Sequence, residues 1–249
     1  MPTDPRKRQK KQERRAAKRK AKHHQLAREK QAGLAERLTA AAKYPVLDSC
    51  ATTALWDEGL GWVCLSRELP SGHVAFAVFL VDRYCLGVKN VMADVVGRFE
   101  YNSQIVSKMR SHFSAKDLSP ADVRKLVEEA VEYARGLGLH PHPDYQKAKR
   151  IFGDIDAGAS TEQIEFGKGG KPLFIAGPND TPERCRQILK TLEETCGPGG
   201  FHYQIPFPDA EGIFPEPQRG VPPPFIGTMP DWDMDGSQDE EDEEDDEHA

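Results

Sequence analysis

Apolar residues concentrate in the middle of the chain, where their spacing predicts a hairpin. Residues 74–81 form an unbroken apolar run, residues 61–67 form a shorter segment before it, and a Leu-Pro-Ser-Gly turn separates them at 69–72. A strand that is apolar on both faces is typical of the interior of a sheet. We therefore expect strands at 61–67 and 73–81, with the second inside the sheet and residues 85–88 extending it past a bulge.

Two helices are indicated by their first residues and by apolar positions at the helical period. Ser119 stands before Pro120, a strong start signal, and glycines at 136 and 138 end the periodic pattern. Thr181 and Pro182 begin the second helix in the same way. The other expected elements are short helices at 49–57 and 143–152, and a hairpin of 163–166 with 173–176 around the turn 167–171.

The order of these elements predicts an α+β fold. Hairpins and helices follow one another without a regular βαβ pattern, so we expect a single mixed domain at residues 44–204, with a mostly antiparallel sheet and packed helices. Composition changes at both ends of this domain. It predicts a basic helical arm at 1–43, a Pro-rich extended segment at 205–230 and an acidic disordered tail at 231–249.

The net charge of −6 conceals two ends of opposite sign. Residues 1–43 carry 15 Lys and Arg against 4 Asp and Glu, a net charge of +11, whereas residues 201–249 carry 1 against 15, a net charge of −14. The arm also has a narrow apolar stripe, including Leu26, Leu34 and Leu38, that would dock on the domain or on a partner.

The basic arm is the clearest functional signal in the chain. Charge placed all around a helix favours a polyanion such as RNA, DNA or the ribosome. Because residues 1–43 contain no Phe or Trp, binding would depend on phosphates and not on base stacking. The alternative is a solvated extension without a dedicated ligand. The residues expected to contact nucleic acid are Arg6, Lys7, Arg8, Arg14, Arg15, Lys18, Arg19 and Lys20.

The acidic tail suggests two further hypotheses. It would compete with nucleic acid for the basic arm, or residues 201–249 would bind a protein partner. The segment beginning Asp231, Asp233 and Asp235 also matches the opening of a calcium-binding loop. Pro230 before it, Gln238 at the eighth position and Asp242 at the twelfth argue against a true EF-hand, and weak divalent binding by the acidic run is the alternative.

Three carboxylates give the domain a candidate catalytic site. Asp82 follows the long apolar strand, and Asp154 and Asp156 lie close together in sequence. With Lys89 they would form a Mg²⁺ site, as in a metal-dependent hydrolase or nuclease. The alternative is that Asp82 caps a turn and the other two belong to a surface loop. No cofactor is predicted, although a divalent cation would fit this hypothesis.

Weaker candidates lie nearby. His140, His142 and Asp144 have metal-binding side chains but sit among prolines typical of a loop, whose Asp144 would cap the next helix. Cys85 and His73 would pair as nucleophile and base, or Cys85 is an ordinary buried residue. The turn Gly167-Lys-Gly-Gly-Lys171 lacks the spacing of a phosphate-binding loop, although its two lysines would be able to contact phosphate.

Cysteine content and hydropathy indicate a reduced, cytoplasmic protein without a membrane partner. The five cysteines are scattered and form no CxxC pair, which is typical of free thiols. The longest apolar run, residues 74–81, is far shorter than the roughly 20 residues that cross a bilayer.

Three stretches resemble a family of uncharacterised bacterial proteins. They are residues 79–90 (FLVDRYCLGVKN), residues 133–144 (YARGLGLHPHPD), and residues 166–172 through 177–180. The resemblance covers about residues 45–204, and it implies a domain boundary and a bacterial origin without implying an activity. The leading hypothesis is therefore a non-enzymatic accessory factor that contacts RNA, ribosome or DNA through its arm. The alternatives are the hydrolase or nuclease and a protein-interaction module acting through its tail.

Overall fold

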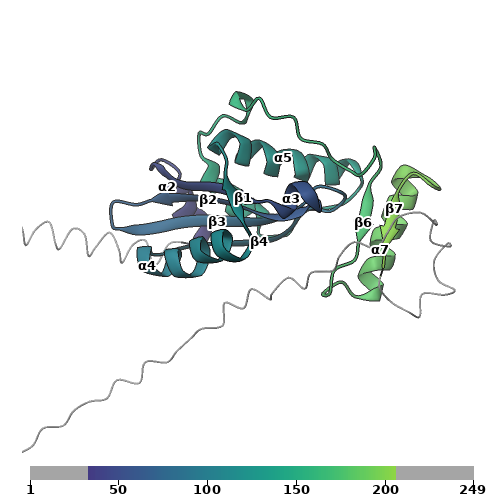
Figure 1. The fold of residues 1–249 in the computed structure, drawn as a ribbon, viewed down its shortest axis with the longest axis horizontal. Coiled ribbons are helices and arrows are strands. Elements are labelled where there is room, and N and C mark those ends of the chain that lie inside the picture. Colours follow the sequence, from purple (N-terminus) through teal and green to yellow (C-terminus); the bar gives the residue numbers. More distant parts are fainter. Residues whose placement is uncertain (1–32, 206–249) are drawn as a thin grey trace, which may run out of the picture. The chain divides into compact units, whose positions relative to one another are not determined.

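The computed structural model describes residues 33–205, and their main element is a five-stranded antiparallel sheet. Its strand order is β4-β3-β2-β1-β5, so four strands that follow one another in sequence are neighbours and β5 is added beside β1 (Figure 1). The strands are β1 (Val46–Thr52), β2 (Leu60–Glu68), β3 (His73–Asp82), β4 (Gly87–Gly97) and β5 (Ala115–Asp117). The α+β fold class predicted from the sequence is confirmed.

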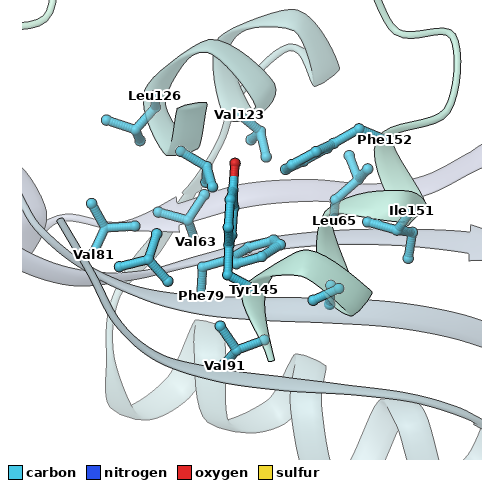
Figure 2. Packing of buried hydrophobic residues seen from close by; sticks show 14 of the residues in the cluster. Val63, Leu65, Phe79, Val81, Val91, Val123, Leu126, Tyr145, Ile151 and Phe152 are labelled. Carbon is cyan, nitrogen blue, oxygen red and sulfur yellow. The ribbon is translucent and has the colours of Figure 1, made fainter. Parts of the chain in front are cut away.

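Helices cover both faces of this sheet, with α5 and α4 on opposite sides (Figure 1). On the first face, alternate residues of β2 and β3, such as Val63 and Phe79, meet α5 and the segment around Tyr145 and Phe152 (Figure 2). The ring of Phe79 stacks on Phe152 with centroids 5.5 Å apart. The helices of this layer are α2 (Leu34–Ala41), α5 (Pro120–Gly136), α6 (Tyr145–Ala148) and the 3₁₀ turn Lys149–Phe152.

The second face is covered by α4 (Arg98–Tyr101), which continues into two π-helical segments, Asn102–Val106 and Lys108–His112. Tyr101, Ile105 and Met109 are each 1% exposed. They are spaced by four, and in a regular α-helix of 3.6 residues per turn such a row drifts around the axis. The wider π turns compensate for this drift, so all three side chains point at the sheet.

The C-terminal part forms a small parallel unit beside the main sheet. Strand β6 (Leu173–Ile175), helix α7 (Pro182–Cys196) and strand β7 (His202–Gln204) follow in order, and β6 pairs with β7 in parallel. A second core holds this unit together, and the amide of Leu173 donates to the carbonyl of Tyr84, 3.0 Å away, at the end of the main sheet.

Several sequence-based predictions are confirmed. The hairpin of β2 and β3 forms as expected, and β3 lies inside the sheet with buried residues on both faces. Helix α5 begins with a complete capping box of Ser119 and Asp122, and α7 begins after Thr181, whose side chain caps it. The helix expected at 143–152 is present as α6 and the 3₁₀ turn that follows it.

Three predictions of local structure are wrong. The helix expected at 49–57 is strand β1 followed by the single turn α3 (Ala54–Asp57), because β1 pairs with β2 on one side and β5 on the other. Residues 85–88 do not extend β3: the chain turns there and β4 begins at Gly87. The hairpin expected at 163–176 is only a tight turn bridging Lys168 and Lys171, since β6 pairs with β7 instead.

Packing also begins earlier than the predicted domain boundary at residue 44. Leu38 and Ala41 of α2 are fully buried in the first core, and Leu34 packs against it. The end of the predicted arm is therefore part of the folded domain. Residues 1–32 and 206–249 lie outside the described residues, as do the predictions made for them.

A buried guanidinium connects this first layer to the sheet. Arg67 of β2 is 4% exposed, and it donates to the carbonyls of Ile151 and Phe152, each 2.8 Å away, and to that of Tyr44, 2.6 Å away. Burial lowers the pKa of Arg67, an effect that the charge of Asp154 opposes. One side chain thus donates to three carbonyls, of which that of Phe152 also accepts the amide of Ile155 at 3.2 Å.

Gly87 is a position where the fold requires glycine. Its φ is +64°, and a Cβ there would lie 2.6 Å from the carbonyl oxygen of Ala130 in α5. We expect Gly87→Ala to lower the free energy of unfolding by about 2 kcal/mol, because both the backbone conformation and the helix contact would be strained. Urea denaturation followed by circular dichroism measures this.

The matched control is Gly97→Ala, at the other end of the same strand. Nothing lies within 4 Å of a Cβ at Gly97, and its φ is −64°. This variant should stay within about 0.5 kcal/mol of the parent. Equal losses for the two variants would contradict the close approach of α5 to β4.

Candidate functional site

A network of polar side chains lies on the second face of the sheet, beneath α4. The hydroxyl of Tyr101 lies 2.9 Å from Oδ2 of Asp48 and 2.8 Å from Oγ of Ser66. Because a phenol carries one proton, Tyr101 donates it to the carboxylate. The amide of Asp48 in turn donates to Oγ of Ser66 at 3.0 Å. Burial is the main reason why the pKa of Tyr101 is raised, so the phenol stays protonated as the donor.

Two cysteines lie beside this network. Cys50 of β1 and Cys64 of β2 are direct partners in the antiparallel register, so their side chains share the second face. Cys64 is 1% exposed, and its sulfur lies 4.0 Å from the Tyr101 hydroxyl.

The environment makes the two thiols unequal. The hydrogen bond from Cys64 is the main cause that lowers the pKa of Cys50, and the positive charge of Arg110 adds to it against the effect of burial. Donating that bond raises the pKa of Cys64 well above its usual value, and burial raises it further. Cys50 is therefore the thiol that more readily forms a thiolate, which is the nucleophilic form.

Arg110 closes the site from the second π-helical segment. Its Nη2 atom lies 2.8 Å from Oδ1 of Asp117 in β5 and 3.8 Å from Oδ1 of Asp48. A hollow with space for about one water molecule lies between this guanidinium, the two thiols and the apolar side chains of Ile105 and Met109. The site thus combines two thiols of unequal pKa with a cation and the carboxylate of Asp48, which, like that of Asp117, opposes the lowering of the Cys50 pKa.

The structure places Asp82 in a different role from the predicted metal ligand. The side chain is 6% exposed at the end of β3, and its Oδ1 accepts the amides of Tyr84 at 2.8 Å and Cys85 at 3.0 Å. The carboxylate therefore fixes the turn between β3 and β4. Burial raises its pKa, whereas Lys89 and the backbone donors oppose that shift.

The other two carboxylates of the predicted catalytic site do not join Asp82. Asp154 is exposed in the loop after the 3₁₀ turn, and exposed Asp156 caps the next turn by accepting the amide of Gly158 at 2.8 Å. Within residues 33–205 no group of three or more His, Cys, Asp or Glu side chains could hold a metal ion. The three residues thus lack the common site that the hydrolase hypothesis requires.

Lys89 pairs with a different carboxylate. Its Nζ atom lies 3.5 Å from Oδ2 of Asp180, which is 7% exposed and also accepts the amide of Gly177 at 2.8 Å. Arg184 binds the other oxygen of Asp180 at 3.1 Å. This cluster links β4 to the start of α7, and so joins the parallel unit to the main sheet.

The other candidate side chains either contact residues close to them in sequence or lie far from their proposed partners. Nδ1 of His142 accepts the amide of Asp144, 3.2 Å away, and the Asp144 side chain pairs with Lys147 instead of capping α6. His73 begins β3, whereas Cys85 lies in the turn beyond the other end of that strand, so they form no nucleophile and base pair.

The two lysines of the glycine-rich turn are exposed and engaged by protein groups. Nζ of Lys168 lies 5.5 Å from the ring centroid of Tyr84, and Nζ of Lys171 donates to the carbonyl of Gly199 at 2.8 Å. Their predicted contact with phosphate stays a prediction.

The eight basic residues between Arg6 and Lys20 and the calcium candidates Asp231, Asp233 and Asp235 lie outside the described residues. Their predicted contacts with nucleic acid and divalent cations remain predictions. Among residues 33–205 no helix is long and apolar enough to cross a membrane.

Sequence reasoning missed the thiol site because it assigned residues 49–57 to a helix. Had that segment been taken as a strand, the alternation of Asp48 and Cys50 would have matched that of Cys64 and Ser66 on a neighbouring strand. The spacing of Tyr101, Ile105 and Met109 was the signal for the helix that covers them.

Comparisons of the chain with protein-family models, with curated proteins and with solved structures find no match. The resemblance to a family of uncharacterised bacterial proteins stays a prediction.

The hydrogen bond between Tyr101 and Asp48 can be measured as a coupling energy. We expect Tyr101→Phe to lower the free energy of unfolding by about 1–2 kcal/mol, because the partly buried acceptor Asp48 loses its donor. In a cycle with Asp48→Ala the two losses should fall short of additivity by about 1 kcal/mol. Urea denaturation of the four proteins gives these values.

As a control, Tyr101→Phe is combined with Glu132→Ala, which changes an exposed side chain of α5 in the opposite layer. These two losses should add, since the residues share no partner. Additive losses for Tyr101 and Asp48 as well would contradict the hydrogen bond between them.

The turn-forming role of Asp82 predicts a specific pH dependence. Because its pKa is raised in the folded protein, the native state binds this proton more tightly than the unfolded state does. Its contribution to stability is therefore complete below the usual pKa and is lost as pH rises through the raised value. We expect Asp82→Asn to remove this decline, and to be as stable as the parent at pH 7 or more so.

Asp82→Ala, which removes the acceptor as well, should lose about 1–3 kcal/mol at pH 7. Chemical denaturation at several pH values measures all three proteins. A strong loss of stability in Asp82→Asn at pH 7 would show that the turn requires the negative charge.

Proposed function

We propose that the protein is a non-enzymatic accessory factor that binds the phosphate backbone of nucleic acid, in free form or in the ribosome, through its basic N-terminal segment. The observation that carries this proposal is the net charge of +11 over residues 1–43, which arises from 15 Lys and Arg against 4 Asp and Glu. A charge of this density attracts polyanions and releases their bound counterions.

The described residues support the proposal through α2. This helix ends the basic segment, and its Leu38 and Ala41 side chains are fully buried against the sheet layer. Arg37 pairs with Asp94 of β4 at 2.9 Å. The basic segment is therefore joined to the domain by a packed helix, so a nucleic acid bound to it stays close to the domain.

Sequence-independent binding follows from the composition of the segment. Residues 1–43 hold no Phe or Trp, so bases have no side chain of these types to stack on. Contacts to phosphates carry little sequence information. Any selectivity of the protein for one RNA, DNA or ribosomal site would come from the domain to which α2 belongs.

The proposal is tested by the salt dependence of binding. Full-length protein is titrated against labelled single-stranded RNA and duplex DNA of generic sequence, and fluorescence anisotropy is measured at several salt concentrations. We expect the affinity to fall steeply with salt. Replacing four basic residues by Gln should reduce the slope on single strands by up to about 3, at roughly 0.7 for each phosphate that is no longer neutralised. These four are Arg14, Arg15, Arg19 and Lys20.

The matched control replaces four exposed basic residues of the domain by Gln. These are Arg135, Lys147, Arg186 and Lys190. The control changes the net charge by the same amount but should keep the parent slope. Equal effects of the two quartets, or no binding at low salt, would overturn the proposal.

Nothing in residues 33–205 favours the alternative of a metal-dependent hydrolase or nuclease, because Asp82 fixes a turn while Asp154 and Asp156 lie exposed in a loop. The protein-interaction hypothesis depends on residues 201–249, nearly all of which lie outside the described residues.

A further inference from the structure

Cys50 and Cys64 lie opposite each other in the sheet, at a backbone separation that a disulfide can span. Both are free thiols, and they are direct partners on adjacent antiparallel strands. The Cα atoms of such partners are about 4.5–5.5 Å apart. Disulfides span Cα separations of about 4.4–6.8 Å, so the bond requires little movement of the backbone.

The surroundings assign different roles to the two sulfurs. Cys50 lines the hollow together with Arg110, whose positive charge favours the thiolate. Cys64 lies deeper, with its sulfur 4.0 Å from the Tyr101 hydroxyl, and the neighbouring Cys50 and burial raise its pKa. Cys50 is thus the thiol that attacks the oxidant, and Cys64 is the thiol that attacks the oxidised sulfur of Cys50.

We propose that Cys50 and Cys64 form a redox-active dithiol, which a small peroxide oxidises to a cross-strand disulfide. The hollow between them limits the oxidant. It has space for about one water molecule, so a bulky disulfide such as oxidised glutathione is excluded, whereas hydrogen peroxide, with two oxygen atoms, needs only a small shift of the lining side chains.

The reaction has two balanced steps. The Cys50 thiolate attacks one peroxide oxygen, the O–O bond breaks, and the leaving hydroxide takes a proton and departs as water, leaving a sulfenic acid on Cys50. The Cys64 sulfur then attacks the Cys50 sulfur, and the S–O bond breaks. The departing hydroxide takes the Cys64 proton and leaves as a second water. Two thiols thus lose two electrons and two protons to one molecule of peroxide.

The other thiols of the chain serve as internal references. Cys85 and Cys185 are both fully buried, and burial raises the pKa of each. They should therefore resist oxidation in the folded protein. Cys196 is partly exposed and could itself be oxidised. It is therefore replaced in the test protein by the substitution Cys196→Ser.

The test uses the full chain carrying Cys196→Ser. The folded protein is treated with hydrogen peroxide, remaining thiols are alkylated, and peptides are mapped by mass spectrometry. We expect a linked peptide joining Cys50 and Cys64, with the loss of two hydrogen atoms. Oxidation of Cys50 should be roughly tenfold or more faster than that of Cys85. Oxidised glutathione at the same concentration should form the link much more slowly.

Two variants separate the roles of the sulfurs. In Cys64→Ser, oxidation should stop at the Cys50 sulfenic acid, which a cyclic dione reagent traps as an adduct. In Cys50→Ser, Cys64 should stay reduced. Circular dichroism before treatment shows that each variant is folded.

The proposal is overturned if folded parent protein forms no Cys50–Cys64 link while Cys85 oxidises equally fast, or if the link appears only in urea. Equal rates with peroxide and oxidised glutathione would overturn the assignment of the oxidant. The absence of a dione adduct in folded Cys64→Ser would overturn the role of Cys50.

Discussion

The fold depends on one constraint, which is that β2 and β3 are buried on both faces. Val74 through Phe79 leave almost no surface to water, so each face of the sheet needs a helical layer of its own. Helices α2, α5 and α6 form one layer, and α4 with its π-helical continuation forms the other. Polar side chains of the sheet are consequently buried under these layers, and they must form hydrogen bonds with other protein groups instead of with water.

These partners explain why several charged residues that resemble catalytic groups are structural. Arg67 satisfies three carbonyls around the first layer, and Asp82 accepts the amides of the turn after β3. Asp180 binds Lys89 and Arg184 where α7 begins. The second face differs, because there the polar network around Tyr101 adjoins two thiols and a hollow. Among the described residues, the second face is therefore where two thiols, a cation and a hollow lie together.

The elements that could be predicted from the sequence are those with local signals. The capping residues Ser119 and Thr181 and the apolar run of β3 define their elements without reference to distant residues. Strand β1 could not be predicted in this way, because its residues become a strand only between β2 and β5. The same holds for β6, whose partner β7 lies beyond a helix. The thiol site depends on the register of β1, so it was missed together with that strand.

Hydrogen exchange measured by mass spectrometry tests the central claim, that both helical layers depend on the β2 and β3 pair. The account predicts that amides of β2 and β3 exchange most slowly, and only when the whole domain unfolds. Amides of residues 98–112 should exchange faster through local opening, because Tyr101, Ile105 and Met109 are the only buried residues of this segment and Phe99 is 86% exposed. Loss of protection in β2 and β3 while α5 stays protected would contradict the account.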